Sequence, residues 1–120
     1  MMFDEFTKNM IVIGKKTVTR RVVRNNRRPA VPDTIHKIKI SRDSKIYGYI
    51  KIISCHKEKL KDITYSDVLR EGFTSKKQYL EYFMRINNVT DLDTEVWVIN
   101  FEKVRENNGG NSKDEIRRYD

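Results

Sequence analysis

Alternating apolar residues in the stretches Thr17 to Val23 and Glu95 to Val104 constrain the fold of this chain more than any other feature. Side chains that alternate in this way point to opposite faces of a β-strand. Two isoleucine-rich runs, Ile35 to Ser41 and Ile46 to Cys55, are joined by residues 42–44 and predict a hairpin. These stretches together predict a sheet of mostly antiparallel strands.

Helical patterns lie before and between these strands. Apolar residues spaced three and four apart predict a helix at the start of the chain, which Gly14 is placed to end. They are Phe3, Phe6, Met10 and Ile13. Two capping-box patterns, Thr64-x-x-Asp67 and Ser75-x-x-Gln78, predict two further helices. Because strands and helices do not alternate strictly, we predict a compact α+β domain with its helices packed to one side.

The 120 residues are enough for one domain, which we place at residues 1–104, and we predict that residues 105–120 form a polar, mobile tail. The single cysteine, Cys55, excludes an internal disulfide, and no Cys/His cluster has the spacing of a zinc site. No apolar run approaches the roughly 18 residues that span a membrane. We therefore predict a cytoplasmic protein with no metal, no cofactor and no membrane partner. Its oligomeric state stays open.

The net charge of +8 is concentrated in one region of the chain. Residues 8–45 hold twelve lysines and arginines and only two acidic residues, whereas the two signs balance in residues 46–120. Such a localised field favours a polyanionic partner, for which RNA, DNA and a phosphorylated small molecule all qualify. The alternative is a solvated basic face, which is common in a chain that is 35% charged. The candidate nucleic-acid contacts are Lys15, Arg20, Arg21, Arg24, Arg27, Arg28, Lys37 and Lys39.

Three segments stand in a characteristic order along the chain. They are Gly14 to Arg21 (GKKTVTRR), Leu69 to Phe73 leading into Tyr79 to Phe83, and Val96 to Glu102 (VWVINFE). Together they resemble the ASCH domain of the PUA-like superfamily, over residues 3–104. The resemblance implies a small mixed or antiparallel β-barrel flanked by helices, with a cleft beside the glycine-lysine motif. It also implies a link to RNA or to modified nucleobases, which PUA-like domains commonly bind.

Some small ASCH members that resemble this chain are amidohydrolases that remove the acyl group from N4-acetylcytidine with a lysine, a threonine and a glutamate. The resemblance places these three roles on Lys16, Thr19 and Glu71, and the last arginine of the motif on Arg21. Other related members act on RNA itself. Two departures from the family pattern are the stretch Pro32 to Thr34, where many members have a glycine-aspartate turn, and Thr19, where many have glutamate.

Hydrolysis of an amide needs a nucleophile, a base and an acid for the leaving nitrogen. Thr19 is the candidate that attacks or orients a water, Lys16 is the candidate base, and Glu71 is the candidate proton shuttle. A free lysine, with a pKa of about 10.4, is protonated at pH 7. Burial and nearby cations would lower that pKa and Glu71 would raise it, and the sequence leaves the balance open. The alternatives are a phosphate contact for Lys16, an ordinary strand residue for Thr19 and a solvent-facing carboxylate for Glu71.

A non-catalytic RNA-binding module is the rival function. The loop Arg24 to Asp33 carries three arginines, two asparagines and two prolines, and we predict that it grips a nucleotide backbone and limits the size of the substrate. The alternative is a loop whose charge serves solubility alone. Tyr47, Tyr49 and Trp97 are candidates for stacking on a base, although alternating aromatic residues in strands more often belong to the core.

Overall fold

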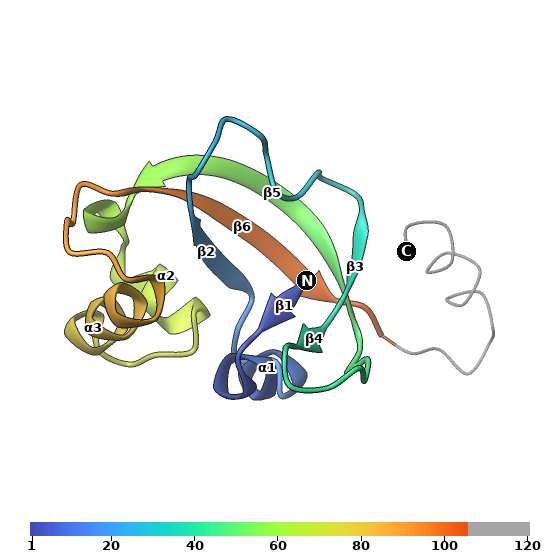
Figure 1. The fold of residues 1–120 in the computed structure, drawn as a ribbon. Helices are drawn as coiled ribbons and strands as arrows, with labels where there is room; N and C mark the ends of the chain where they lie inside the picture. The colour runs from blue at the N-terminus through green and yellow to red at the C-terminus, as the bar shows by residue number, and fades with distance from the viewer. Residues whose placement is uncertain (106–120) are drawn as a thin grey trace.

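The computed structural model describes residues 1–105 of the chain. Its main sheet has four antiparallel strands, in the order β2 (Val18–Val22), β6 (Glu95–Lys103), β5 (Tyr49–Lys59) and β3 (Ile35–Lys37). The sheet curls into half of a barrel (Figure 1). Both alternating stretches of the sequence are strands, so those predictions are confirmed.

The two isoleucine-rich runs form the predicted hairpin, but residues of the first run are paired in two different sheets. β3 pairs with the start of β5. The chain then bends at Ile38, and β4 (Lys39–Ile40) pairs in parallel with β1 (Met2–Phe3). Ile38 is fully buried, and its backbone groups bond those of Tyr47 and Gly48. A long connection therefore joins the two runs instead of a tight turn.

Helix α1 (Glu5–Val12) begins later than the sequence pattern predicts. The Asp4 carboxylate caps the helix by accepting a hydrogen bond from the backbone N–H of Thr7, at 2.7 Å. Phe6 and Ile13, which the pattern placed on one apolar face of the helix, are 48% and 62% exposed. The side chains that α1 buries are Thr7 and Ile11. This part of the predicted face is wrong, because the residues before Asp4 belong to β1 and the cap sets where the helix starts.

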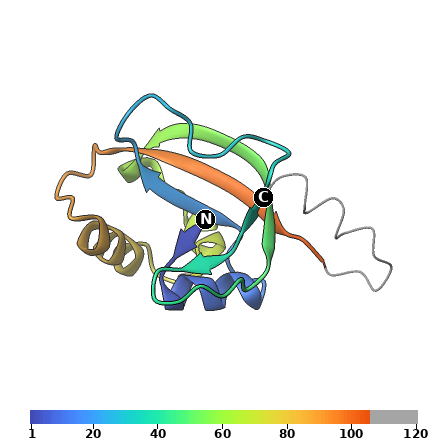
Figure 2. The ribbon, with the colours of Figure 1, turned by 45° about the vertical axis from the view of Figure 1, so that its right-hand side comes forward.

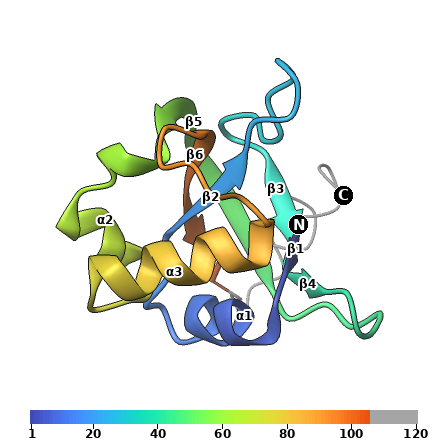
Figure 3. The same cartoon turned by 60° about the vertical axis from the view of Figure 1, so that its left-hand side comes forward.

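Two further helices confirm the capping-box predictions. Thr64 caps α2 (Tyr65–Arg70) and Ser75 caps α3 (Lys76–Asn87), each by accepting a hydrogen bond from a backbone N–H of the first turn. A short 3-10 helix, η1 (Leu60–Asp62), leads from β5 toward them. All three α-helices lie on one side of the curled sheet, as predicted (Figures 1 and 3).

Strand β6 is the centre of the fold because both of its faces are buried. Val96 and Val98 pack in a cluster with residues of β2, η1, α2 and α3. Trp97, Ile99 and Phe101 pack in a second cluster with residues of β1, α1 and β5. This opposition confirms the predicted alternation. Trp97 is 7% exposed, so it belongs to the core and not to a base-stacking surface.

The end of helix α2 depends on Gly72, which directly follows Glu71. Gly72 has φ +93°, and a Cβ atom added there would lie 3.2 Å from Met10 Cε. We expect Gly72→Ala to lower the free energy of unfolding by about 2–3 kcal/mol, since a left-handed backbone costs an L-residue roughly 1–2 kcal/mol and crowding adds about 1 kcal/mol. Urea unfolding measures the loss.

Gly14→Ala is the matched control for this prediction. Gly14 has φ +85°, but an added Cβ atom would meet no atom within 4 Å. The substitution should therefore cost only the backbone strain, roughly 1–2 kcal/mol. Equal losses in the two variants would show that Met10 yields to the extra methyl group.

Among residues 1–105, no helix is both long enough and apolar enough to cross a membrane. The polar tail that the sequence predicts at 105–120 lies outside the described residues, apart from residue 105 itself.

Candidate active site

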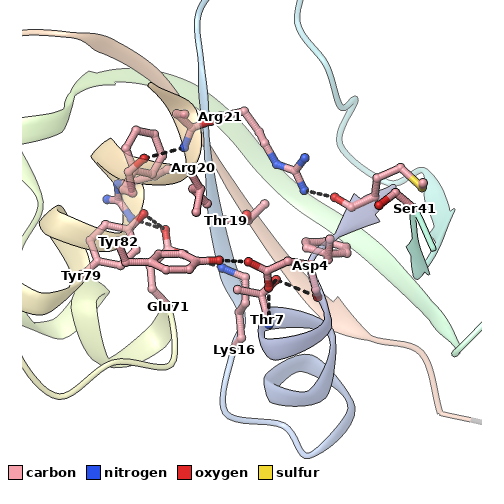
Figure 4. Close-up of a pocket in the computed structure, with 15 residues that line it drawn as sticks. Asp4, Thr7, Lys16, Thr19, Arg20, Arg21, Ser41, Glu71, Tyr79 and Tyr82 are labelled. Atoms are coloured by element: carbon pink, nitrogen blue, oxygen red, sulfur yellow. Dashed lines mark hydrogen bonds and ion pairs between the residues drawn. The ribbon is translucent and has the colours of Figure 1, made fainter. Parts of the chain in front are cut away.

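A cavity of about 360 Å³ lies between strands β1 and β2. Within residues 1–105 these two strands are not paired with one another, since β1 pairs with β4 and β2 with β6. The Arg21 guanidinium bridges the gap by donating a hydrogen bond to the Met2 carbonyl at 2.8 Å. Figure 4 shows the side chains that line the cavity, which come from β1, α1, β2 and α3, from the connection between α1 and β2, from the end of α2 and from Ser41 after β4.

A buried ion pair between Lys16 and Glu71 forms one wall of the cavity. The Lys16 ammonium donates to Glu71 Oε1 and, at 2.9 Å, to the Val18 carbonyl. Lys16 is 3% exposed and Glu71 is 1% exposed. The backbone N–H of Lys16 bonds the Met10 carbonyl at 3.1 Å, which ties it to the end of α1, and Glu71 is the residue that ends α2. This burial excludes the alternative in which Glu71 is a solvent-facing carboxylate.

The environment of Lys16 changes its acidity. Burial lowers the pKa of Lys16 below its ordinary value of 10.5, because the ammonium loses its water. The Glu71 carboxylate raises the pKa, while the charges of Arg21 and Arg20 lower it further. The net shift is downward, so a larger fraction of Lys16 is a neutral amine near pH 7 than for a free lysine.

Thr19 lines the same cavity, on strand β2 (Figure 4). It is 5% exposed. No hydrogen bond joins its hydroxyl to another group within residues 1–105. Because Thr19 lines the cavity and its hydroxyl is not committed to another group, the hydroxyl can bind or attack a ligand there.

Arg20 lies behind this wall, enclosed by three carboxylates. Its Nη2 atom lies 2.6 Å from Asp67 Oδ2 and 3.1 Å from Glu58 Oε1, and its Nη1 atom lies 3.3 Å from Glu71 Oε2. Burial alone would lower the pKa of Arg20, but the carboxylates outweigh it and raise that pKa. The Nε atom is buried without a partner in the described part of the chain. The guanidinium thus holds Glu71 in place, and its side chain is 0% exposed.

Apart from Arg20 and Arg21, the candidate nucleic-acid contacts do not line the cavity. The loop between β2 and β3 arches over the side of the sheet opposite the helices (Figures 1 and 2). Its three arginines are exposed, and they do not line the cavity: Arg24, Arg27 and Arg28. Lys15 is exposed after α1, whereas Lys37 on β3 and Lys39 on β4 are partly buried.

The sequence analysis missed several polar residues of the cavity wall as site residues, among them Asp4, Thr7, Tyr79 and Tyr82. The Tyr79 hydroxyl donates to Glu71 Oε2 at 2.9 Å, and the Tyr82 hydroxyl donates to Asp4. Burial raises the pKa of both tyrosines, so they stay protonated donors. The one local signal is the spacing of Asp4 and Thr7, which is typical of a helix cap. The tyrosines follow an apolar helical pattern that carries no such signal.

The cavity therefore brings together a hydroxyl, an amine of lowered pKa and a carboxylate, which are the groups that Thr19, Lys16 and Glu71 were predicted to supply. The fold brings them together, since the two partners of the ion pair are 55 positions apart in the sequence. Within residues 1–105 no three or more His, Cys, Asp and Glu side chains are grouped to hold a metal ion.

The chain matches no protein-family model, and no curated protein matches it. Solved structures do resemble it. The ASCH domain from Lactobacillus crispatus is 14% identical, over 82% of this chain and 70% of that one, with a TM-score of 0.65. A protein from Enterococcus faecalis is 15% identical, with the same coverage and a TM-score of 0.66. The ASCH protein from Zymomonas mobilis is 23% identical, over 95% of this chain and 75% of that one, with a TM-score of 0.58. The curled antiparallel sheet, the three helices and these likenesses together identify an ASCH-like fold of the PUA-like type.

Proposed function

We propose that this protein binds a cytosine-type nucleobase in the cavity and hydrolyses the amide of an N4-acyl group. The observation that carries the proposal is the buried Lys16–Glu71 ion pair in a cavity that Thr19 also lines. These residues stand where the ASCH resemblance puts the lysine, the glutamate and the threonine of an N4-acetylcytidine amidohydrolase. A volume of about 360 Å³ is also within the range of small-molecule sites.

In the proposed reaction the Thr19 hydroxyl oxygen attacks the acyl carbon, and Lys16, as the neutral amine, takes the hydroxyl proton. Glu71 passes this proton from Lys16 to the leaving N4 atom, so that the C–N bond breaks and cytidine departs with a free amino group. A water molecule then hydrolyses the Thr19 ester and releases the carboxylic acid. The lowered pKa of Lys16 supports the first step, and the hydrogen bond from Tyr79 keeps Glu71 Oε1 turned toward Lys16.

Incubation with N4-acetylcytidine tests this proposal. The protein should release cytidine and acetate, which chromatography separates from the substrate. Thr19→Ser keeps a hydroxyl and should retain activity, whereas Thr19→Val keeps the shape without the hydroxyl and should lose about 10²-fold or more in rate. Absence of cytidine release by the parent protein, or equal rates in the parent and Thr19→Val, would refute the proposed chemistry.

Binding of RNA is the second candidate function, and the exposed arginines of the loop between β2 and β3 favour it. Replacing Arg24, Arg27 and Arg28 together by alanine should weaken binding of a single-stranded RNA and leave nucleoside hydrolysis unchanged. Each lost phosphate contact should also reduce the slope of log affinity against log salt by roughly 0.7. Filter binding or fluorescence anisotropy at several salt concentrations measures both effects.

The matched control removes three exposed cations from helix α3, namely Lys76, Lys77 and Arg85. If the net charge alone attracts RNA, this variant should weaken binding as much as the loop variant does. If the loop itself binds RNA, the loop variant should lose more RNA affinity than the α3 variant. If the loop variant binds RNA as tightly as the parent at low salt, the loop arginines do not bind RNA and their charge serves solubility alone.

A further inference from the structure

Arg21 differs from the other two cations that line the cavity. Lys16 has one carboxylate partner and Arg20 has three. Arg21 donates to a neutral acceptor, the Met2 carbonyl, and its guanidinium lies 5.0 Å from the centre of the Phe3 ring. Within residues 1–105 no carboxylate forms an ion pair with Arg21. The cavity therefore contains a cation whose charge has no direct counter-ion among the described side chains.

Arg21 is only partly buried, and its hydrogen bond to the Met2 carbonyl lies at the exposed edge of the cavity, where a ligand can reach it. Burial lowers the pKa of Arg21, and the Glu71 carboxylate and more distant groups offset the effect only in part. The guanidinium stays protonated and offers five N–H donors in a planar fork, of which one is used by Met2. An anionic group that enters the cavity would supply the missing charge and accept the remaining donors.

Asp4 also lines the cavity, and its negative charge would oppose an anionic ligand. Its carboxylate is already engaged. Oδ1 accepts from the backbone N–H and the hydroxyl of Thr7, at 2.7 Å and 2.8 Å, and Oδ2 accepts from Tyr82. Three donors thus hold the charge of Asp4 toward α1 and α3. The Arg21 guanidinium points elsewhere, to the side of β1, and is left to meet a ligand.

The position of Arg21 in the cavity defines where such a group would lie. Figure 4 places its guanidinium on the opposite side of Thr19 from the Glu71 carboxylate, in the direction of Ser41. A ligand that spans the cavity would have one end at the proposed hydrolytic group and the other at Arg21. A nucleotide has this form, with its base at one end and its phosphate at the other.

We propose that the cavity takes a nucleotide in preference to the neutral nucleoside, with the phosphate bound by Arg21. The inference rests on the proposed function for the place of the base near Lys16. A planar fork of donors matches a phosphate group in a bidentate manner, which a point charge does not. The cavity volume of about 360 Å³ suits a single nucleotide, so the preference should already appear with a mononucleotide.

Calorimetric titration with cytidine and with cytidine 5′-monophosphate tests the inference. The parent protein should bind the monophosphate about tenfold to a hundredfold more tightly than cytidine. Arg21→Gln should abolish this difference and leave the affinity for cytidine nearly unchanged, and Arg21→Lys should restore part of it. Circular dichroism confirms that each variant is folded. A merely structural role of Arg21 would weaken both ligands equally.

Arg85→Gln is the control, because it removes one exposed arginine of α3 that does not line the cavity. It should keep the full preference for the monophosphate.

Three results would overturn the inference. They are equal affinities of the two ligands in the parent, no binding of either ligand at millimolar concentration, and a preference for the monophosphate that survives in Arg21→Gln. If the dinucleotide CpC shows the Arg21-dependent gain and the monophosphate does not, the bound group is an internal phosphodiester, and the mononucleotide form of the inference fails.

These binding measurements are independent of hydrolysis. Arg21-dependent binding of the monophosphate, without cytidine release from N4-acetylcytidine, would contradict the proposed reaction and leave the phosphate site standing. Hydrolysis of N4-acetylcytidine without any preference for the monophosphate would support the proposed reaction and contradict the phosphate site.

Discussion

Glu71→Gln should destabilise the protein by about 3–5 kcal/mol at pH 7, because it leaves the buried Lys16 ammonium without its charged partner. Lys16 would keep the Val18 carbonyl and a neutral amide as acceptors. Arg20 would keep Asp67 and Glu58, so the loss falls mainly on Lys16. Urea unfolding followed by circular dichroism measures the change.

The loss should shrink as the pH rises, which separates it from a packing defect. The pKa of Lys16 is lowered in the folded protein, so at pH values between that pKa and 10.5 the unfolded chain binds more protons and stability rises with pH. In Glu71→Gln the cause that raises the pKa is gone, and burial, Arg21 and Arg20 still lower it. The variant should therefore gain more stability than the parent between pH 7 and about pH 9.5.

Glu58→Gln is the matched control, since it removes another carboxylate that bonds Arg20. The Glu58 side chain is 23% exposed, and Arg20 keeps two other carboxylates without it. We expect a loss of about 1 kcal/mol or less, with little dependence on pH. If the two variants lose the same stability, or Glu71→Gln has the pH dependence of the parent, then Lys16 does not depend on Glu71 as described.

The second large effect concerns catalysis. Lys16→Met should lower kcat/KM for N4-acetylcytidine by about 10²- to 10⁴-fold, the usual contribution of a positioned base. The fold should survive, because Glu71 keeps Arg20 and Tyr79 as partners. Lys15→Met removes a charge from the exposed neighbouring residue and should retain activity. Equal activity of the parent and Lys16→Met would exclude Lys16 as the base.

The dependence of kcat/KM on pH in the parent protein gives a second test of Lys16 as the base. Lys16 acts as a base only after losing its proton, so kcat/KM should rise with pH and level off above the pKa of Lys16. The midpoint of this rise should lie below 10.5, because burial outweighs the opposing effect of Glu71. A midpoint at or above 10.5 would contradict the environment that surrounds Lys16.

Local patterns predicted much of the fold. The alternation in β2 and β6 and the capping residues Thr64 and Ser75 act over a few residues, so the sequence displays them directly. The buried face of α1 was predicted wrongly, because its orientation depends on the short strand β1 and on the Asp4 cap. A strand of two residues leaves no periodicity to read.

The site could not be predicted from local patterns at all. Lys16, Thr19 and Glu71 were singled out through the resemblance to the ASCH domain, and the residues alone allowed a phosphate contact, a strand residue and an exposed carboxylate. Arg20 meets Glu58 and Asp67 across 38 and 47 residues of sequence, and such pairings leave no periodic signal. For that reason Arg20 was grouped with the basic surface, although its side chain is enclosed by carboxylates.

The bridge from Arg21 to the Met2 carbonyl has a consequence for how this scaffold can change. Paired strands are held about 4.8 Å apart by their backbone bonds whatever their side chains are. Within residues 1–105 no backbone ladder joins β1 to β2, so backbone pairing does not fix the width of the cavity between them. Substitutions at Met2, which lines the cavity and is 46% exposed, can therefore enlarge or narrow the cavity while the four-stranded sheet stays intact. Selection or design can in this way fit the same fold to ligands of different size.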